Sequence, residues 1–273
     1  MDCPNDPLPA GARIYAALRS DYGSAHERAS RAIPVEMPVA IELNGIAYAV
    51  MMASPCDLED FVTGFLLSEG LAEAGEIGEI VLHPAEGGAG IVARTNLPPH
   101  RLEPVMERAR RRLGDSSCGI CGLESIDLAL RPLPALAPSP LPEPQAVQRA
   151  LAAMRGAQVL GDATGATHAA AFCAPDGSLI ALREDVGRHN ALDKVIGALA
   201  RAGRDASDGF LVVTSRASYE LVEKAVRAAC PLLVAISAPT SLAVERARAA
   251  GLALAVLARD DSMLWISGPM LED

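Results

Sequence analysis

Apolar and polar residues alternate along residues 39–50 in a pattern that predicts a β-hairpin. Apolar side chains recur at every second position from Val39 to Leu43, and the alternation resumes after Asn44-Gly45. An Asn-Gly pair favours a two-residue hairpin turn because both positions accept a positive φ. We therefore expect two antiparallel strands joined at this pair.

The next apolar patterns predict two helices separated by two strands. Asp57 is expected to cap a helix over residues 58–66, where apolar residues recur at helical spacing. Residues 77–93 predict two short strands broken by Gly87-Gly88. Residues 101–113 predict a second helix with one apolar face.

A proline-rich stretch then divides the chain. Prolines occupy positions 132, 134, 138, 140, 142 and 144. Proline cannot continue a helix and cannot donate a hydrogen bond to a sheet, so this stretch is expected to be an extended linker or surface loop.

Downstream of the prolines, apolar strands and amphipathic helices predict an α/β fold. Several of these strands are apolar throughout, which is typical of strands buried on both faces of a parallel sheet. The expected strands cover residues 167–174, 179–184, 210–214, 232–237 and 252–258, and the expected helices contain residues 192–199, 219–229 and 242–250. We expect a three-layer α/β/α domain with an antiparallel hairpin at one side of its sheet.

The predicted domain organisation follows from these patterns. Residues 1–33 are expected to form a partly disordered N-terminal tail, and residues 34–131 a smaller β-rich α+β domain. Residues 132–144 form the linker, and residues 145–273 the α/β/α domain, which is expected to bind a cofactor. Whether the two parts pack as one unit stays open.

Composition and charge narrow the function classes. The chain has 273 residues, of which half are apolar, so it can bury a large core. No apolar run reaches the length of a membrane-spanning helix, and the N-terminus lacks the pattern of a secretory signal, so we expect a cytoplasmic protein. A formal charge of −10 argues against nucleic-acid binding but permits a small anionic ligand.

Two of the six cysteines form the pair Cys118-Gly119-Ile120-Cys121, within a glycine-flanked loop over residues 115–122. Cytosolic thiols stay reduced, so this spacing indicates metal binding or catalysis rather than a structural disulfide. A helix predicted over residues 123–130 would place Cys121 near a helix N-terminus, which favours thiolate. Cys173 and Cys230 lie in apolar segments and are expected to be buried hydrophobic residues.

Five arginines precede this pair along the chain. Nearby cations would favour thiolate at both cysteines, although the same residues also suit a solvated helix face. They are Arg101, Arg108, Arg110, Arg111 and Arg112.

Four polar segments follow predicted strands and form a second candidate site. They cover residues 184–190, 214–216, 237–241 and 259–262. In open α/β sheets, ligands bind outside the carboxyl ends of the strands, and hydroxyl groups and arginines there suit phosphate and ribose. Helix caps have the same composition, so a single segment is weak evidence. Together, the four indicate a ligand-binding edge.

Two histidines near this edge permit more than one interpretation. His189 begins a predicted helix beside Arg188 and Asn190, which suits a polar heterocycle or phosphate but equally a capped, salt-bridged helix start. His168 begins a strand among small residues and is equally well explained as a structural histidine. Metal binding through either one stays open.

Four sequence runs resemble the FdhD family of formate dehydrogenase accessory proteins, in the family's order and spacing. The resemblance extends from about Pro34 to the C-terminus. The runs are residues 117–122 around the cysteine pair, residues 165–170 (Gly-Ala-Thr-His-Ala-Ala), residues 183–194 (Arg-Glu-Asp-Val-Gly-Arg-His-Asn-Ala-Leu-Asp-Lys) and residues 237–240 (Ser-Ala-Pro-Thr).

The resemblance implies a sulfur carrier, and hence a sulfurtransferase. Members of the family take sulfur from an L-cysteine desulfurase and pass it to the molybdenum cofactor of formate dehydrogenase. The cofactor is molybdenum bis-molybdopterin guanine dinucleotide, which would be bound as cargo. The family's larger domain has a cytidine-deaminase-like α/β/α fold, and a homodimer is usual. Cys118 matches the family's persulfide-carrying cysteine, with Cys121 as its partner.

The resemblance also directs the choice of cofactor-binding residues. The family's guanine-dinucleotide contact maps onto Leu257, Ala258, Arg259, Asp260, Asp261 and Ser262. The further candidates are His168, Asp185, Arg188, His189, Asn190, Thr214, Arg216, Ser237 and Thr240. The chain departs from the usual family residues at Ser215, Tyr219 and Leu257.

Three other protein classes are alternatives to a sulfur carrier. A zinc deaminase would need a His-x-Glu or Cys-x-Glu tripeptide, and neither occurs in the chain. A thioredoxin-like oxidoreductase would carry its cysteine pair directly after a first strand, whereas here the pair follows a helix. A chaperone that only holds the cofactor or the apoenzyme stays open, and replacing Cys118 distinguishes it from a carrier.

Overall fold

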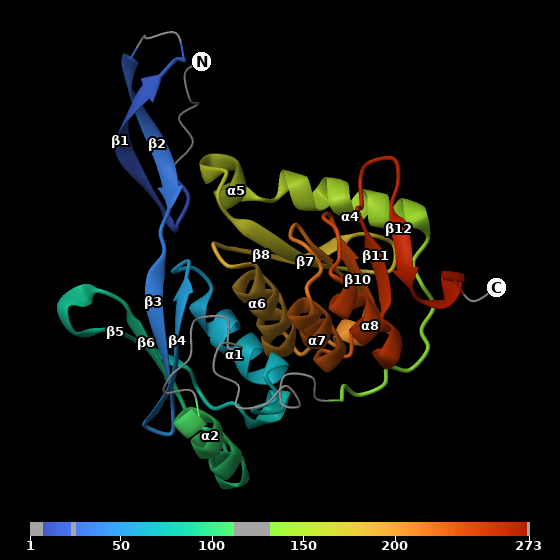
Figure 1. Cartoon of the computed structure of the whole chain (residues 1–273). Helices are drawn as coiled ribbons and strands as arrows, with labels where there is room; N and C mark the ends of the chain where they lie inside the picture. The colour runs from blue at the N-terminus through green and yellow to red at the C-terminus, as the bar shows by residue number, and fades with distance from the viewer. Residues whose placement is uncertain (1–7, 23–25, 112–131, 272–273) are drawn as a thin grey trace.

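A computed structural model describes residues 8–22, 26–111 and 132–271 (Figure 1). Within these residues the strands form three sheets of two, six and four strands. No helix in the described ranges is long and apolar enough to cross a membrane. The α/β fold class expected from the sequence is confirmed.

The four-stranded sheet has the strand order β4-β3-β6-β5. Its strands are β3 (Met37–Leu43), β4 (Ile46–Ala53), β5 (Val81–Pro84) and β6 (Ile91–Thr95). The predicted turn between β3 and β4 is confirmed, because Asn44 and Gly45 both have positive φ, 52° and 79°. Helix α1 (Leu58–Ser68) packs its apolar residues against this sheet, and α2 (Pro99–Arg111) contributes Val105 to the same core.

Asp57 differs from its predicted role. It occupies the N-cap position of α1, but its φ is 52° and its side chain makes no capping hydrogen bond. Its Oδ1 lies 3.5 Å from Nε of Arg183, in a strand distant in the sequence. The expectation of a side-chain cap is therefore wrong, because a tertiary ion pair orients this carboxylate.

The six-stranded sheet has the strand order β12-β11-β10-β9-β7-β8. Strands β9, β10 and β11 are parallel, whereas β7 is antiparallel to both β8 and β9, and β12 is antiparallel to β11. Every residue of β9, β10 and β11 is buried, as predicted from their continuous apolar runs. The strands are β7 (His168–Cys173), β8 (Leu179–Asp185), β9 (Phe210–Val213), β10 (Leu232–Ala235), β11 (Ala253–Val256) and β12 (Leu264–Ser267).

Helices cover both faces of this sheet and complete three layers. On one face, α6 (Arg188–Arg201), α7 (Tyr219–Arg227) and α8 (Ser241–Ala250) bury one apolar cluster. On the other face, α4 (Pro144–Gly156) buries a second cluster with the opposite side chains of the strands. The short α5 (Val159–Thr164) follows α4. Neither α4 nor β12 was predicted from the sequence.

The proline-rich stretch lies along the larger unit. Leu133 and Leu136 pack against the core beneath α6–α8, and the backbone N–H of Leu136 donates to the carbonyl of Ala250 over 2.8 Å. This stretch forms no helix or strand over residues 132–143, as its prolines require.

The two units meet where α1 crosses α6. A Cβ built on Gly64 would lie 1.7 Å from the carbonyl oxygen of Asp193, and one built on Gly197 would lie 1.9 Å from that of Asp60. The two helix backbones are therefore in direct contact, and only glycine fits at either position.

The N-terminal segment forms a hairpin where the sequence predicts a tail. Strands β1 (Ala12–Ser20) and β2 (His26–Pro34) pair antiparallel over their whole length. Almost all of their residues are exposed. The hairpin buries few side chains, so its sequence has no pattern of apolar residues that would predict two strands.

Candidate functional site

The carboxyl ends of β8, β9, β10 and β11 lie at one edge of the six-stranded sheet. Strands β8 and β9 run in the same direction because each is antiparallel to β7, and β9, β10 and β11 are parallel. The four polar segments predicted from the sequence therefore share this edge, as expected. Helices α6, α7 and α8 also begin here, so their positive dipole ends favour an anion at this edge.

His168, Arg188 and His189 come together at this edge. Burial lowers the pKa of His168, and the nearby Arg188 and His189 lower it further, so the neutral imidazole is favoured. The Nε of Arg188 is buried and has no hydrogen-bond partner within the described part of the chain. A buried donor of this kind is uncommon in folded proteins. The cluster therefore contains a hydrogen-bond donor, Nε of Arg188, that the described residues do not use.

Glu220 of α7 joins this cluster and was not predicted. Nε2 of His189 lies 3.0 Å from Oε2 of Glu220. Burial, the largest single effect, would raise the pKa of Glu220, but His189, Ser218 and Arg188 together outweigh it and the pKa is lowered. Ser218 also donates to Glu220 over 3.2 Å. In the sequence, Glu220 resembles an ordinary acidic residue in the first turn of a helix, so only the fold reveals its contact.

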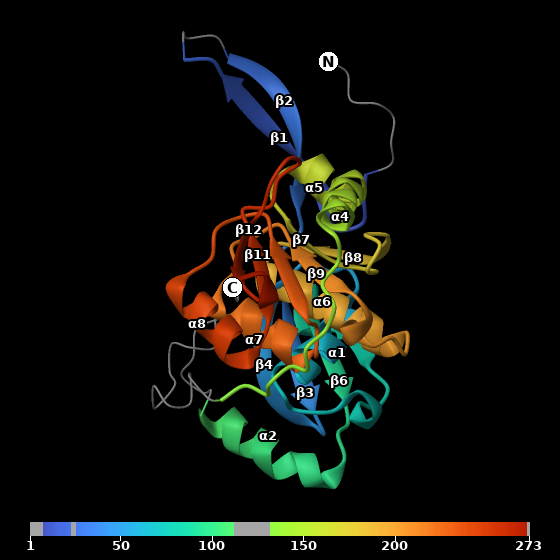
Figure 2. The same cartoon turned by 90° about the vertical axis from the view of Figure 1, so that its right-hand side faces the viewer.

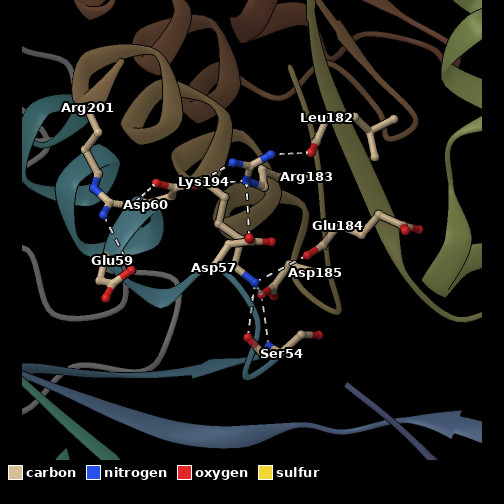
Figure 3. Close-up of polar contacts among 10 residues, drawn as sticks. All are labelled: Ser54, Asp57, Glu59, Asp60, Leu182, Arg183, Glu184, Asp185, Lys194 and Arg201. Carbon is tan, nitrogen blue, oxygen red and sulfur yellow. Dashed lines mark hydrogen bonds and ion pairs between the residues drawn. The ribbon is translucent and has the colours of Figure 1, made fainter. Parts of the chain in front are cut away.

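Asp185 and Asn190 are buried, and both form hydrogen bonds within the protein. Figure 3 shows the contacts of Asp185 with Ser54 and Lys194. Asp185 lies 2.7 Å from Nζ of Lys194, and it accepts from the backbone N–H of Ser54 over 2.9 Å. Its other oxygen accepts from Gly187 N–H over 2.8 Å and from Nδ2 of Asn190 over 2.9 Å. A direct contact with a ligand would need this loop to open. In this structure both residues position the loop between β8 and α6, and their predicted contact with a ligand stays a prediction.

Lys194 completes this buried pair. The side chains of Lys194 and Asp185 are both 0% exposed, and Lys194 also donates to the carbonyl of Ser54 over 3.1 Å. Removing one partner of a buried ion pair typically costs about 3–5 kcal/mol, because the other charge is left without compensation. The pair therefore fixes the loop to the smaller unit.

Two more polar networks join the units. Arg183 of β8 contacts Asp60 of α1 over 2.7 Å, and Arg201 of α6 contacts the other oxygen of Asp60 (Figure 3). Lys224 of α7 lies 2.9 Å from Asp193 and donates to Ser68 over 2.8 Å. Burial would lower the pKa of Lys224, but Asp193 and Glu69 raise it. These contacts hold the candidate edge of the large sheet against α1.

Of the predicted segment Leu257–Ser262, residues Arg259 to Ser262 form one wall of a pocket, whereas Leu257 and Ala258 do not line it. Leu257 has a φ of 52°, which is unusual for a branched residue. Arg259 donates to the carbonyls of Ala258 and Ile236, and Asp260 pairs with Arg155 of α4. The pocket has a volume of about 320 Å³. Its lining comprises Pro144, Gln145, Val147, Gln148, Leu151, Arg259, Asp260, Asp261, Ser262, Met263 and Trp265.

This pocket mixes apolar walls with a few polar groups, as small-molecule sites do. Asp261 and Ser262 are exposed, and the Ser262 hydroxyl donates to Asp261 over 3.0 Å. The sequence placed the loop correctly after a strand, but it gave no sign that α4 and Trp265 form the opposite walls.

The remaining predicted residues of the edge differ in their surroundings. Thr240 is the N-cap of α8 and accepts from Ala243 N–H over 3.3 Å, so the capping interpretation holds for it. Thr214 accepts from Ala169 N–H over 3.0 Å. Arg216 is exposed, and Ser237 is half-buried beside the loop, with its carbonyl accepting from Leu257 N–H over 3.2 Å.

Cys118, Cys121 and the loop over residues 115–122 lie outside the described residues, as does the predicted helix over residues 123–130. Arg101, the first arginine of the cluster, is paired with Glu73 and Glu76 over 2.9 and 2.8 Å. Burial raises the pKa of both Cys173 and Cys230 to about 12, which confirms them as inert core thiols. Burial also raises the pKa of Cys56.

The described ranges contain no group of three or more histidine, cysteine, aspartate or glutamate side chains arranged to hold a metal ion. His189 is 3.0 Å from Glu220, and His168 lies beside Arg188, whose charge disfavours a bound cation.

The fold and the site define an α/β protein with an anion-suited strand edge and a small-molecule pocket beside it. The chain belongs to the FdhD/NarQ family, whose model matches residues 34–270. This confirms the resemblance seen in the sequence motifs.

Individual relatives agree with this assignment. The chain is 44% identical over 274 residues to the sulfur carrier protein FdhD of Xanthomonas euvesicatoria, covering 100% of this chain and 97% of that protein. It is 46% identical over 240 residues to the FdhD of Variovorax paradoxus, covering 87% and 85%. It also matches the crystal structure of a candidate formate dehydrogenase accessory protein from Desulfotalea psychrophila, with a TM-score of 0.73 and 25% identity over 96% of this chain and 98% of that one.

Proposed function

We propose that this chain is a sulfur carrier that acts in the maturation of formate dehydrogenase. The observation that carries the proposal is the family match over residues 34–270, together with the pair Cys118-Gly119-Ile120-Cys121 in a chain otherwise 44% identical to a named sulfur carrier. Fold alone would not support a function, but a thiol pair supplies the chemistry that sulfur transfer needs.

The first step is a thiol exchange on a persulfide of an L-cysteine desulfurase. The thiolate of Cys118 attacks the outer sulfur of the donor persulfide, and a new sulfur–sulfur bond forms on Cys118. The donor's sulfur–sulfur bond breaks, and its cysteine leaves as a thiolate. Cys121 either relays this sulfur or resolves it as a disulfide, and the two roles stay open.

The acceptor in this proposal is the molybdenum bis-molybdopterin guanine dinucleotide cofactor, bound as cargo before it enters the catalytic subunit of formate dehydrogenase. The pocket at Arg259–Met263 suits a nucleotide end, with Gln148 and Asp261 as hydrogen-bonding groups. The cluster of His168, Arg188 and His189 lies three strand spacings away, about 14 Å along the edge. An extended dinucleotide can contact both.

This proposal predicts a mass change on one residue. After incubation with a cysteine desulfurase and L-cysteine, the chain should gain about 32 Da, one sulfur atom, and Cys118→Ala should gain none. Intact-mass spectrometry before and after reduction measures the gain. Cys56→Ala is the matched control, because Cys56 is a half-buried thiol that is not part of the pair, and it should load like the wild type. Equal loading of Cys118→Ala would refute the assignment.

A further inference from the structure

The hairpin β1–β2, residues 12–34, is called the arm here. Both views show it extending away from the two units, beyond α5 (Figures 1 and 2). Among its strand residues only Ala12 is buried. An isolated two-stranded hairpin is at best marginally stable in water, so an arm of this length is expected to gain stability from a partner.

The arm presents apolar side chains to solvent. Leu18 is 63% exposed, Ile14 58% and Tyr15 50%. Ile14 pairs with Ala32 and Leu18 with Arg28, and cross-strand partners share a face of the ribbon. One face therefore carries an aliphatic row with an arginine near the tip. Its two free edges can also accept another strand.

The charge of the arm is opposite to that of the chain. It carries Arg13, Arg19, Arg28 and Arg31 against Asp21 and Glu27, whereas the whole chain has a formal charge of −10. Arg19 lies 3.4 Å from Glu27, but both side chains are mostly exposed and such pairs are weak. An acidic partner would be repelled by most of this protein and attracted by the arm.

The base of the arm is fixed to the ligand-binding edge. Arg31 donates to the carbonyl of Thr164 at the end of α5 over 2.8 Å. The start of α5 is held in turn by Glu184, which lies near the carboxyl end of β8 and accepts from the N–H groups of Leu160 and Gly161 over 2.8 and 2.7 Å. The arm and the β11–β12 connection lie at the same end of the molecule in both views, and α2 lies at the other (Figures 1 and 2).

We propose that the arm docks onto an acidic, partly apolar surface of the formate dehydrogenase that receives the cofactor. This inference rests on the proposed function, because it takes the strand edge as the place where the cargo is held. The arm extends from that edge, so the protein that removes the cargo there meets the arm first. The arm ends at residue 34, where the match to the family model begins.

The test is the affinity of the full-length chain for the purified apoenzyme of formate dehydrogenase from the same organism, measured by biolayer interferometry. The double variant Ile14→Asp/Leu18→Asp should bind at least about tenfold more weakly, because it places two carboxylates on a face expected to meet an acidic surface. Binding of the wild type should also weaken as salt is raised. Val50→Asp is the matched control, since Val50 is 61% exposed on β4, outside the arm, and it should bind like the wild type.

Three further measurements make the outcome decisive: persulfide loading, sedimentation and binding to nucleic acid. Persulfide loading must be equal in all three proteins, so a loss of docking is distinguishable from a failure of sulfur carriage. Unchanged affinity in the double variant would overturn the proposal. A double variant that turns a dimer into a monomer in sedimentation would also overturn it, because the arm would then contact a second copy. The proposal would also be overturned if the arm bound nucleic acid, in a salt-sensitive way, and did not bind the apoenzyme.

Discussion

Replacing Cys118 by alanine is expected to reduce formate dehydrogenase activity to background in cells whose own sulfur carrier has been deleted. Alanine has no sulfur that could form the persulfide bond, and Cys173 and Cys230 are buried with pKa values raised to about 12, so neither can substitute as a nucleophile. The measurement is formate-dependent dye reduction in extracts, with immunoblotting to show equal amounts of each variant.

Cys56→Ala is the matched control in the same cells and should restore wild-type activity, because burial raises the pKa of Cys56 and disfavours its thiolate. Cys121→Ala distinguishes the two open roles of that residue, since a relay is required and a resolving thiol is dispensable. Full activity with Cys118→Ala would show that the protein only holds the cofactor or the apoenzyme.

The second large effect is expected from Gly197→Ala, at the crossing of α1 and α6. The new Cβ would lie 1.9 Å from the carbonyl oxygen of Asp60, and that atom belongs to a helix backbone that cannot rotate away. Overpacking of this kind costs about 3 kcal/mol. The melting temperature should fall by roughly 6 °C or more. Differential scanning calorimetry measures the change.

Gly156→Ala supplies the control for this prediction. Gly156 is the last residue of α4, and nothing lies within 4 Å of a Cβ placed there. Alanine is the better helix former by about 1 kcal/mol, so this variant should melt at or slightly above the wild-type temperature. If Gly197→Ala were as stable as Gly156→Ala, the close contact between the two helices would not exist.

The sequence was most informative where structure depends on neighbouring residues. The turn at Asn44-Gly45 was predictable because two adjacent residues determine it. The buried strands β9–β11 were predictable because a run of four or five apolar residues is typical of a strand that is buried on both faces. The shared position of the four polar segments followed from a rule about parallel sheets, so the order of segments was enough to place them at one edge.

The parts that could not be predicted depend on distant partners. Asp185 was expected to contact a ligand, yet it accepts from Ser54 N–H, 131 residues away in the sequence. Asp57 was expected to cap a helix, but its carboxylate forms an ion pair with Arg183. The arm has almost no buried side chains, so no hydrophobic pattern marked its strands.

The direct packing of the two units has a consequence for the site. The loop between β8 and α6 is held by Ser54 of the smaller unit, so the large sheet does not form this candidate edge alone. Gly64 and Gly197 set the distance between α1 and α6. On α1, Asp60 pairs with Arg183 and Arg201, and Ser68 donates to Asp193, so these contacts fix the register of the two helices. The proline-rich stretch connects two parts that behave as one unit at this edge.

The most direct test of sulfur carriage is a chase of labelled sulfur. The chain is loaded from ³⁵S-cysteine by a desulfurase, purified, and mixed with the molybdenum cofactor in its guanine dinucleotide form. We predict that the label leaves Cys118 and co-elutes with the cofactor after rapid gel filtration in denaturant. Label that stays on the protein, or that is released only as free sulfide, would contradict the account.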